Sequence, residues 1–204
     1  MHSAPLKSIN QFYNKQKAKL QSKLRDNQKT SNLIKRITAN RNNKIDTYLH
    51  QASRWIINYL DKQGISKLVI GKNSLWKQEI KTGRRNNQSF VSIPHAKFIE
   101  MLIYKGALKG IEVITSEESY TSKASFLNLD YIPTYKKDDS KKVTFSGYRE
   151  SRGMYKIRGN ETRINADVNG SYNILRKVIP TAFSGGIEGA VVRPARVTPG
   201  KAKI

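Results

Sequence analysis

A single carboxylate stands at the start of the last helix that the sequence predicts. It is Asp167 in RINADVNGSYNIL, residues 163–175, where a polar run gives way to apolar residues at helical spacing. Two further acids, Glu117 and Glu118, follow the predicted strand in GIEVITSEESYTSK. Strand ends and helix starts of a parallel sheet face the same crevice, so these carboxylates could meet there. Three or more carboxylate oxygens can hold two Mg²⁺ ions about 4 Å apart, an arrangement that hydrolyses phosphodiester bonds.

An ordinary structural role for these acids is the alternative. An Asp at the start of a helix caps it and complements its dipole, and glutamates in loops are solvated. A metal site, by contrast, would explain why like charges collect, because neighbouring carboxylates repel each other unless a cation neutralises them. Spacing alone leaves both interpretations open.

The chain as a whole is strongly basic. Its 204 residues include 38 Lys and Arg against 15 Asp and Glu, a formal charge of +23, which favours nucleic acid as a partner. There is no Cys and there are only three scattered His, so any metal is expected on oxygen ligands. No apolar run is long enough to span a membrane and the N-terminus lacks a signal-peptide core. We therefore expect a cytoplasmic, nucleoid-associated protein without a membrane partner.

Residues 1–63 are predicted to form a long basic helical hairpin. Apolar residues recur at three- and four-residue steps from Leu6 to about Lys29 and from Ser31 to Gln63. Residues 1–62 hold 13 Lys or Arg and three Asp. A charge run is often only a solvated surface, but such surfaces usually mix signs, so phosphate contact is favoured here. The candidate nucleic-acid-binding residues are Lys15, Lys19, Lys23, Arg36, Arg41 and Arg54.

The middle of the chain has the pattern of an α/β sheet. SKLVIGKN indicates a buried strand, Pro94 starts an amphipathic helix that runs to Gly110, and GIEVITS indicates a second strand. This order is typical of a parallel crossover unit. Residues 126–163 contain short β-like pieces that predict a small inserted ribbon, and residues 181–204, rich in Gly and Pro, indicate a flexible basic tail.

The strings EESYTSKAS and INADVNGSYNILRK resemble the C-terminal half of the TnpB/OrfB family of insertion-sequence transposon proteins, relatives of the type V CRISPR effectors. The resemblance extends from PLKSINQFYNK to about Pro180. It implies a partial RNase H-like (RuvC-like) α/β domain, formed by residues 64–125 and 164–180. It also implies an RNA-guided, Mg²⁺-dependent DNA endonuclease, with DNA and a guide RNA as partners.

The resemblance assigns roles to the acids. In the family the Asp of ADVN is the third nuclease carboxylate, which corresponds to Asp167. The second is usually a Glu after a strand, but here Gly71 stands at that place. Some lineages carry a substitute Glu just before the YTSK string, which corresponds to Glu118, with Glu117 as the alternative. The implied catalytic and metal-binding residues are therefore Glu118 and Asp167.

The ribbon departs from the family pattern, in which four cysteines bind zinc. No thiolate or imidazole stands at the approximate ligand places, so no zinc is expected. The residues at these places are Ser125, Asn128, Ile157 and Asn160. We expect hydrogen bonds, and the packing of residues such as Tyr148, Met154 and Tyr155, to hold the ribbon instead.

The family's first nuclease Asp precedes the LKSINQFY string. Within these 204 residues only Asp26, Asp46 and Asp61 are candidates to replace it, and all three fall inside predicted helices. The sequence therefore looks like a truncated copy that is inactive alone. One hypothesis is an endonuclease completed by an upstream fragment or a full-length relative, and another is a nuclease-dead remnant that binds DNA or RNA. A third hypothesis is that the chain is an inert relic of a decayed element.

Overall fold

The computed structural model describes residues 4–25, 27–72, 93–134, 143–188, 190–194, 197 and 199. The chain divides into two compact units. The first comprises residues 1–66, 77–112 and 196–204, and the second comprises residues 67–76 and 113–195. Within the described ranges, no helix combines the length and the apolar character needed to cross a lipid bilayer.

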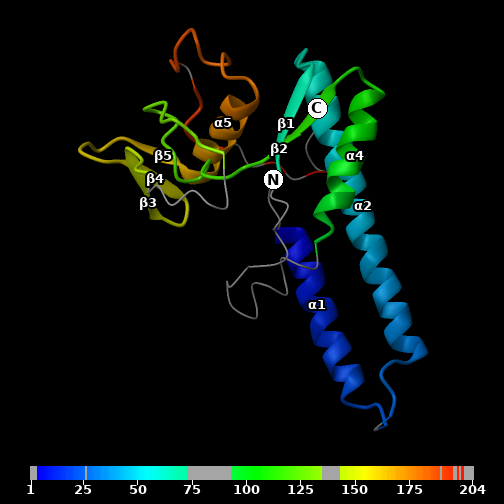
Figure 1. The fold of residues 1–204 in the computed structure, drawn as a ribbon. Coiled ribbons are helices and arrows are strands. Elements are labelled where there is room, and N and C mark those ends of the chain that lie inside the picture. Colours follow the sequence, from blue (N-terminus) through cyan, green and yellow to red (C-terminus); the bar gives the residue numbers. More distant parts are fainter. Residues whose placement is uncertain are drawn as a thin grey trace. The chain divides into compact units, whose positions relative to one another are not determined.

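The first unit contains the helices α1 (Ala4–Gln21), α2 (Asn32–Lys62) and α4 (His95–Ala107). Both α1 and α4 lie against α2 (Figure 1). The long helix begins at Asn32 because the Ser31 hydroxyl caps it, accepting a hydrogen bond from the Ile34 N–H at 3.3 Å. A cluster of buried apolar residues in the core of this unit consists of Leu6, Ile45, Leu49, Ile93 and Met101.

The first helix is shorter than the apolar pattern predicts. The sequence suggests a helix to about Lys29, whereas α1 ends at Gln21. The hydroxyl of Ser22 donates to the Lys19 carbonyl at 3.0 Å. This side chain competes for a carbonyl that would otherwise continue the helical ladder, as Ser often does near helix ends.

The second unit contains a two-stranded sheet of β1 (Lys67–Gly71) and β2 (Glu112–Ser116). The Glu112 N–H donates to the Ser66 carbonyl and the Lys72 N–H donates to the Ser116 carbonyl, so the two strands run in the same direction. Helix α5 (Ala166–Val178) contacts β1. Mixed helix and sheet therefore agree with the α/β class expected from the sequence.

A three-stranded antiparallel ribbon completes the second unit (Figure 1). Its strands are β3 (Gly147–Ser151), β4 (Met154–Ile157) and β5 (Arg163–Asn165). In its register Tyr148 faces Lys156, and Tyr155 faces Ile164. The sequence indicated β-like pieces at KKVTFSGY and GMYKIRG: the second contains β4, whereas β3 begins only at the end of the first. The three residues of β5 are too few for a recognisable alternation.

Part of the segment assigned to a flexible tail belongs to the core of the second unit. That core consists of Phe126, Tyr155, Ile164 and Ala166. Phe183 and Ile187 pack against it, and the Val191 N–H donates to the Tyr172 hydroxyl at 2.9 Å. Gly- and Pro-rich composition suggested flexibility, but the apolar residues spaced between the glycines bury enough surface to dock this segment.

Candidate functional site

Glu118 lies beside Gly71, the last residue of β1. A Cβ built on Gly71 would lie 2.7 Å from Oε2 of Glu118 and 2.6 Å from Cδ1 of Ile174 on α5. Both separations are shorter than real Cβ atoms show, so a larger residue at position 71 would push aside the ends of these two side chains. The Glu118 carboxylate therefore occupies the space into which a side chain at position 71 would project.

Glu117 is engaged differently from its neighbour. Its Oε2 lies 2.7 Å from Nζ of Lys177 on α5, and the Ser119 N–H donates to its other oxygen. Partial burial opposes ionisation of this carboxyl, but the hydrogen bonds from Lys177 and Ser119 outweigh it and lower its pKa. Glu117 thus ties the segment after β2 to helix α5.

Asp167 lies in the first turn of α5 but does not cap the helix. The cap is Asn165, whose Oδ1 accepts hydrogen bonds from the N–H groups of Asp167 at 3.0 Å and Val168 at 3.2 Å. The interpretation of Asp167 as the capping residue is therefore wrong. Its side chain is 88% exposed, and Nη2 of Arg149 lies 3.8 Å from its Oδ1. The carboxylate is accessible to a ligand from solvent.

The donor chemistry of these acids suits Mg²⁺, but the set is incomplete. Asp167 precedes Ile174 by seven residues, about 10 Å along the helix axis, so Glu118 and Asp167 lie at different levels of α5. Within the described ranges, no three His, Asp or Glu side chains gather in the manner of metal ligands. These two residues would supply only part of the ligand set of a metal ion.

Two fully buried asparagines of α5 hold the segment that follows Glu118. Asn169 accepts a hydrogen bond from the Phe126 N–H and donates to the Ala124 carbonyl, both at 2.8 Å. Asn173 donates to the carbonyls of Thr121 at 2.9 Å and Ala124 at 2.8 Å. Sequence reasoning missed this role. The available signal was two amides four residues apart, on one face of an amphipathic helix.

Ser125 and Asn128, which stand at two of the places that the resemblance assigns to zinc ligands, are joined by a hydrogen bond. The Ser125 hydroxyl accepts from the Asn128 N–H at 3.2 Å. Asp130, which the sequence analysis did not single out, accepts from the N–H groups of Ser125 at 2.8 Å and Ser146 at 3.0 Å. It also accepts from the Ser146 hydroxyl at 2.7 Å. One carboxylate thus joins the loop before the ribbon to the start of β3.

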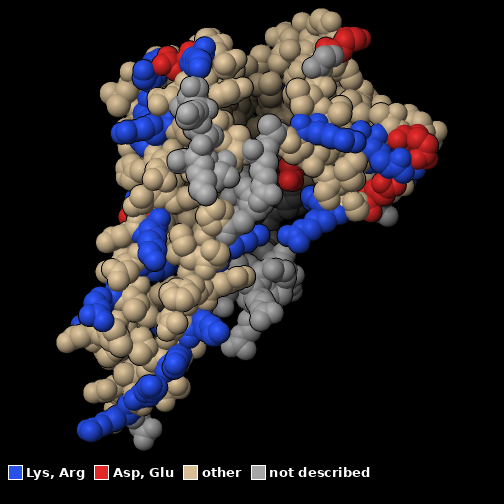
Figure 2. Space-filling model, turned by 180° about the vertical axis from the view of Figure 1, so that it is seen from behind, with Lys and Arg blue, Asp and Glu red and all other residues tan. Residues whose placement is uncertain are grey.

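The candidate nucleic-acid-binding cations lie on α2, on α1 and just after it. Figure 2 shows Lys and Arg side chains in a row over the lower part of these helices. Arg41 is half-buried, and its Nε donates to the buried Asn10 side chain at 2.8 Å, so it also links the two helices. The exposed members of the set are Lys15, Lys19, Lys23, Arg36 and Arg54.

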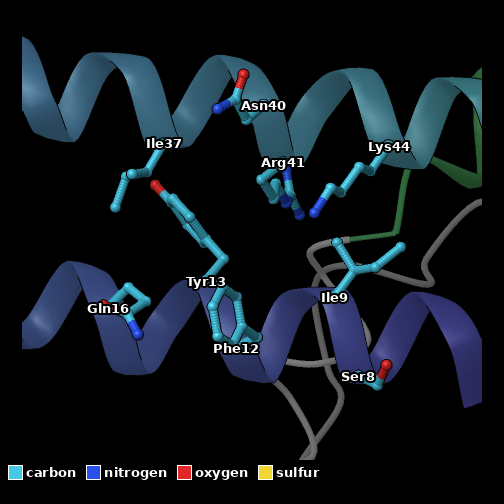
Figure 3. Close-up of a pocket in the computed structure, with 9 residues that line it drawn as sticks. All are labelled: Ser8, Ile9, Phe12, Tyr13, Gln16, Ile37, Asn40, Arg41 and Lys44. Atoms are coloured by element: carbon cyan, nitrogen blue, oxygen red, sulfur yellow. The ribbon is translucent and has the colours of Figure 1, made fainter.

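A hollow of about 500 Å³ lies between α1 and α2 (Figure 3). Tyr13 reaches across it from α1, and its hydroxyl lies 2.9 Å from that of Thr38. The Arg41 guanidinium carbon lies 5.7 Å from the centre of the Tyr13 ring, and Lys44 points into the same space. The helices thus present a positively charged hollow with an aromatic wall.

The comparisons with known proteins agree with this architecture. A family model described as "Probable transposase" (OrfB_IS605) matches residues 1–77, and a model described as "Cas12f1-like, TNB domain" matches residues 95–174. A solved structure, "Cryo-EM structure of the Cas12f1-sgRNA-target DNA complex", is similar with a TM-score of 0.56 and 17% identity. The match covers 85% of this chain and 42% of that chain, so this chain spans less than half of that relative. Among the curated proteins no match was found.

The fold is that of a Cas12f1-like protein with mixed helix and sheet. Together the two family models cover most of the chain and identify a transposase relative, and the chain belongs to the TnpB/OrfB family. This confirms the family resemblance that the strings EESYTSKAS and INADVNGSYNILRK indicated.

Proposed function

We propose that the chain is the nucleic-acid-binding and partial nuclease portion of an RNA-guided DNA endonuclease of the TnpB/OrfB type. In this proposal residues 64–125 and 164–180 form part of an RNase H-like core, and the basic helices of residues 1–63 lead into it. The similar solved structure is named as a complex of Cas12f1 with sgRNA and target DNA, which supports a guide RNA and DNA as partners.

The observation that carries the nuclease assignment is the contact between Glu118 and Gly71. The family's Glu is absent at position 71, and the carboxylate of Glu118 reaches the same space from the segment after β2. Glu117 is the alternative candidate; its carboxylate binds Lys177 and Ser119 and does not reach the space beside Gly71 in the same way. Glu118 and Asp167 would accordingly supply two of the carboxylates of a Mg²⁺ site, with at least one further acid required.

Iron-directed cleavage of the polypeptide tests this assignment without requiring activity. Fe²⁺ replaces Mg²⁺ at carboxylate sites, and with ascorbate and peroxide it cuts the backbone close to the bound ion. We expect cuts near residue 71 and near the start of α5, and we expect Glu118→Gln and Asp167→Asn to abolish them. Glu117→Gln is the matched control and should retain them. Cuts that persist in Glu118→Gln would overturn the role of Glu118.

A binding protein without catalysis is the second candidate function. It is favoured by the incomplete set of acids, because no three metal-ligating side chains gather among the described residues. Plasmid cleavage by the purified 204-residue chain, with Mg²⁺ or Mn²⁺, separates the two. We expect no cleavage, because two carboxylates provide too few ligands for a pair of metal ions. Cleavage that Asp167→Ala abolishes would mean that another acid completes the site.

A further inference from the structure

A hollow of about 680 Å³ beside the ribbon of the second unit has an aromatic lining. Tyr120 and Phe145 contribute two rings whose centres lie 6.1 Å apart, inclined at 41°. Tyr148 on β3 contributes a third ring and remains 42% exposed. Tyr155 on the neighbouring strand, by contrast, fills the core and is fully buried. The ring of Tyr148 packs only in part and leaves a surface open to the hollow.

The same hollow is positively charged. Nζ of Lys123 lies 5.8 Å from the centre of the Tyr120 ring, and the guanidinium carbon of Arg158 lies 5.4 Å from that of Tyr148. Arg149 is the third cation of the lining, and no Asp or Glu is among the described residues that line the hollow. Cations alternating with exposed aromatic rings match a ligand that combines flat bases with phosphates.

The rim of the hollow is held in place by its own contacts. A Cβ at Gly147 would collide with the Tyr155 ring and would lie 2.7 Å from the Lys156 carbonyl, so the strand passes directly over that ring. The Tyr155 hydroxyl donates to the Lys123 carbonyl at 2.8 Å. The Tyr120 carbonyl accepts from the Lys123 and Ala124 N–H groups, both at 2.9 Å. A preformed site of this kind loses little entropy when it binds a ligand.

The hollow also adjoins the candidate nuclease carboxylate. Arg149 lines it, and Nη2 of Arg149 lies 3.8 Å from Oδ1 of Asp167. A strand held in the hollow would therefore pass within reach of Asp167. This is the relationship expected between a strand-positioning subsite and a residue that acts on the same strand.

We propose that this hollow binds an unpaired base of a single DNA strand, with the base stacked on Tyr148 and the flanking phosphates on Lys123, Arg149 and Arg158. A single strand is required because bases within a duplex are stacked on one another and cannot reach the ring. The choice of DNA rests on the proposed function, since Asp167 would act on DNA. Stacking on an aromatic ring tolerates any base, so little sequence preference is expected.

Fluorescence anisotropy with the full 204-residue chain tests the proposal. The probes are a labelled 12-nucleotide oligo-dT, an oligo-rU of the same length and a labelled duplex. Tyr148→Leu should weaken binding of the oligo-dT about 5-fold or more, the loss expected for one stacked base, and should leave duplex binding unchanged. Tyr148→Phe keeps the ring and should restore binding of the single strand. Arg158→Gln should reduce the salt slope of single-strand binding by about 1.

Tyr131→Leu is the matched control, because Tyr131 is 82% exposed and does not line the hollow. It should bind the oligo-dT as the unmodified chain does, and circular dichroism should show the same fold for all variants. Unchanged affinity in Tyr148→Leu, or equal weakening of duplex and single strand, would overturn the subsite. Tighter binding of the oligo-rU than of the oligo-dT would overturn the assignment to DNA. The iron-directed cleavage that tests Glu118 and Asp167 is a separate measurement, so the subsite can fail while the proposed function stands, and the reverse.

Discussion

The carboxylate of Glu118 lies in the space into which a side chain at Gly71 would project. Gly71 has no side chain where one would lie 2.7 Å from Oε2 of Glu118. Glu118 brings its carboxylate to this space from a different segment, the one that follows β2. If Glu118 serves as the nuclease acid, as we propose, acidic side chains at such sites are better compared by the space they occupy than by their alignment.

Gly71→Ala should destabilise the second unit. The added methyl group would meet Cδ1 of Ile174 and the end of Glu118, which are flexible, so we expect a loss of about 1 kcal/mol, the low end for overpacking. Ile174→Val removes Cδ1, and in combination with Gly71→Ala it should recover part of that loss. Urea unfolding of the two single variants and the double variant measures the coupling. Strict additivity would mean that this contact is absent in solution.

Asn169→Ala should cost about 1 to 3 kcal/mol of unfolding free energy. The substitution leaves the buried Phe126 N–H without its partner, which carries a desolvation penalty of that size, whereas the Ala124 carbonyl still accepts a hydrogen bond from Asn173. Ser171→Ala on the exposed face of the same helix is the control and should change stability little. Comparable losses in both variants would show that helix propensity, not the buried amide, sets the stability.

We expect the carboxylate of Asp130, and not a metal ion, to stabilise the connection between the loop before the ribbon and the start of β3. Asp130→Ala removes three hydrogen bonds to Ser125 and Ser146 and is expected to cost about 2 kcal/mol or more. Elemental analysis should find no stoichiometric zinc, and EDTA should leave the melting temperature unchanged. One zinc per chain, or a chelator-sensitive melting temperature, would contradict this prediction.

The sequence predicted the elements better than their contacts. Patterns of apolar residues located α2, α4 and β1 to within a few residues, although β1, expected to be buried, is only half-buried. The candidate acids were found because acids are rare in this basic chain. The reach of Glu118 into the space beside Gly71 depends on the path of the chain between them, which no local pattern contains.

Three further features depend on contacts between residues far apart in the sequence. Asp130 was overlooked because its partner Ser146 is 16 residues away. Tyr148 and Tyr155 look equivalent in sequence, but one lines a hollow and the other fills the core. Phe183 and Ile187 fall in the segment assigned to a flexible tail, because composition does not reveal the aromatic surface of Phe126 and Tyr172 near which they pack.

The unfolding free energy should depend on pH through ionisation of the Tyr155 hydroxyl. Burial, with Asp130 nearby, raises its pKa to about 12 from an ordinary value of 10. Because the folded state favours the neutral form, this contribution to stability is complete below pH 10 and is lost as the pH rises to about 12. Tyr155→Phe should be less stable at pH 8 by about 1 kcal/mol, since it loses the bond to the Lys123 carbonyl. The difference in unfolding free energy between the unmodified chain and Tyr155→Phe should narrow above about pH 10. A difference that stays constant with pH would contradict the raised pKa of Tyr155.

Binding of nucleic acid by the basic helices should depend steeply on salt. Each phosphate contact releases counterions, so several contacts give a slope of log K against log salt of several units. The triple variant Lys15→Glu, Lys19→Glu and Arg36→Glu reverses exposed cations on α1 and α2. Arg41 is not suitable for this test because its bond to Asn10 links the helices. Fluorescence anisotropy on unrelated duplexes and RNAs should show similar weakening for all of them, because phosphate contacts carry no base readout.

A control triple variant separates these contacts from net charge. Lys97, Lys109 and Lys156 are each paired with an acid, at 2.7 Å from Asp46, 2.9 Å from Asp61 and 2.7 Å from Glu161 respectively. Their reversal to Glu changes the net charge by the same amount, but the acid beside each of them already reduces its attraction for phosphate. We expect the α1 and α2 variant to lose far more affinity and more of the salt slope than the control. Equal losses would mean that binding reflects only the overall charge of +23, and that the basic helices are no more than a solvated surface.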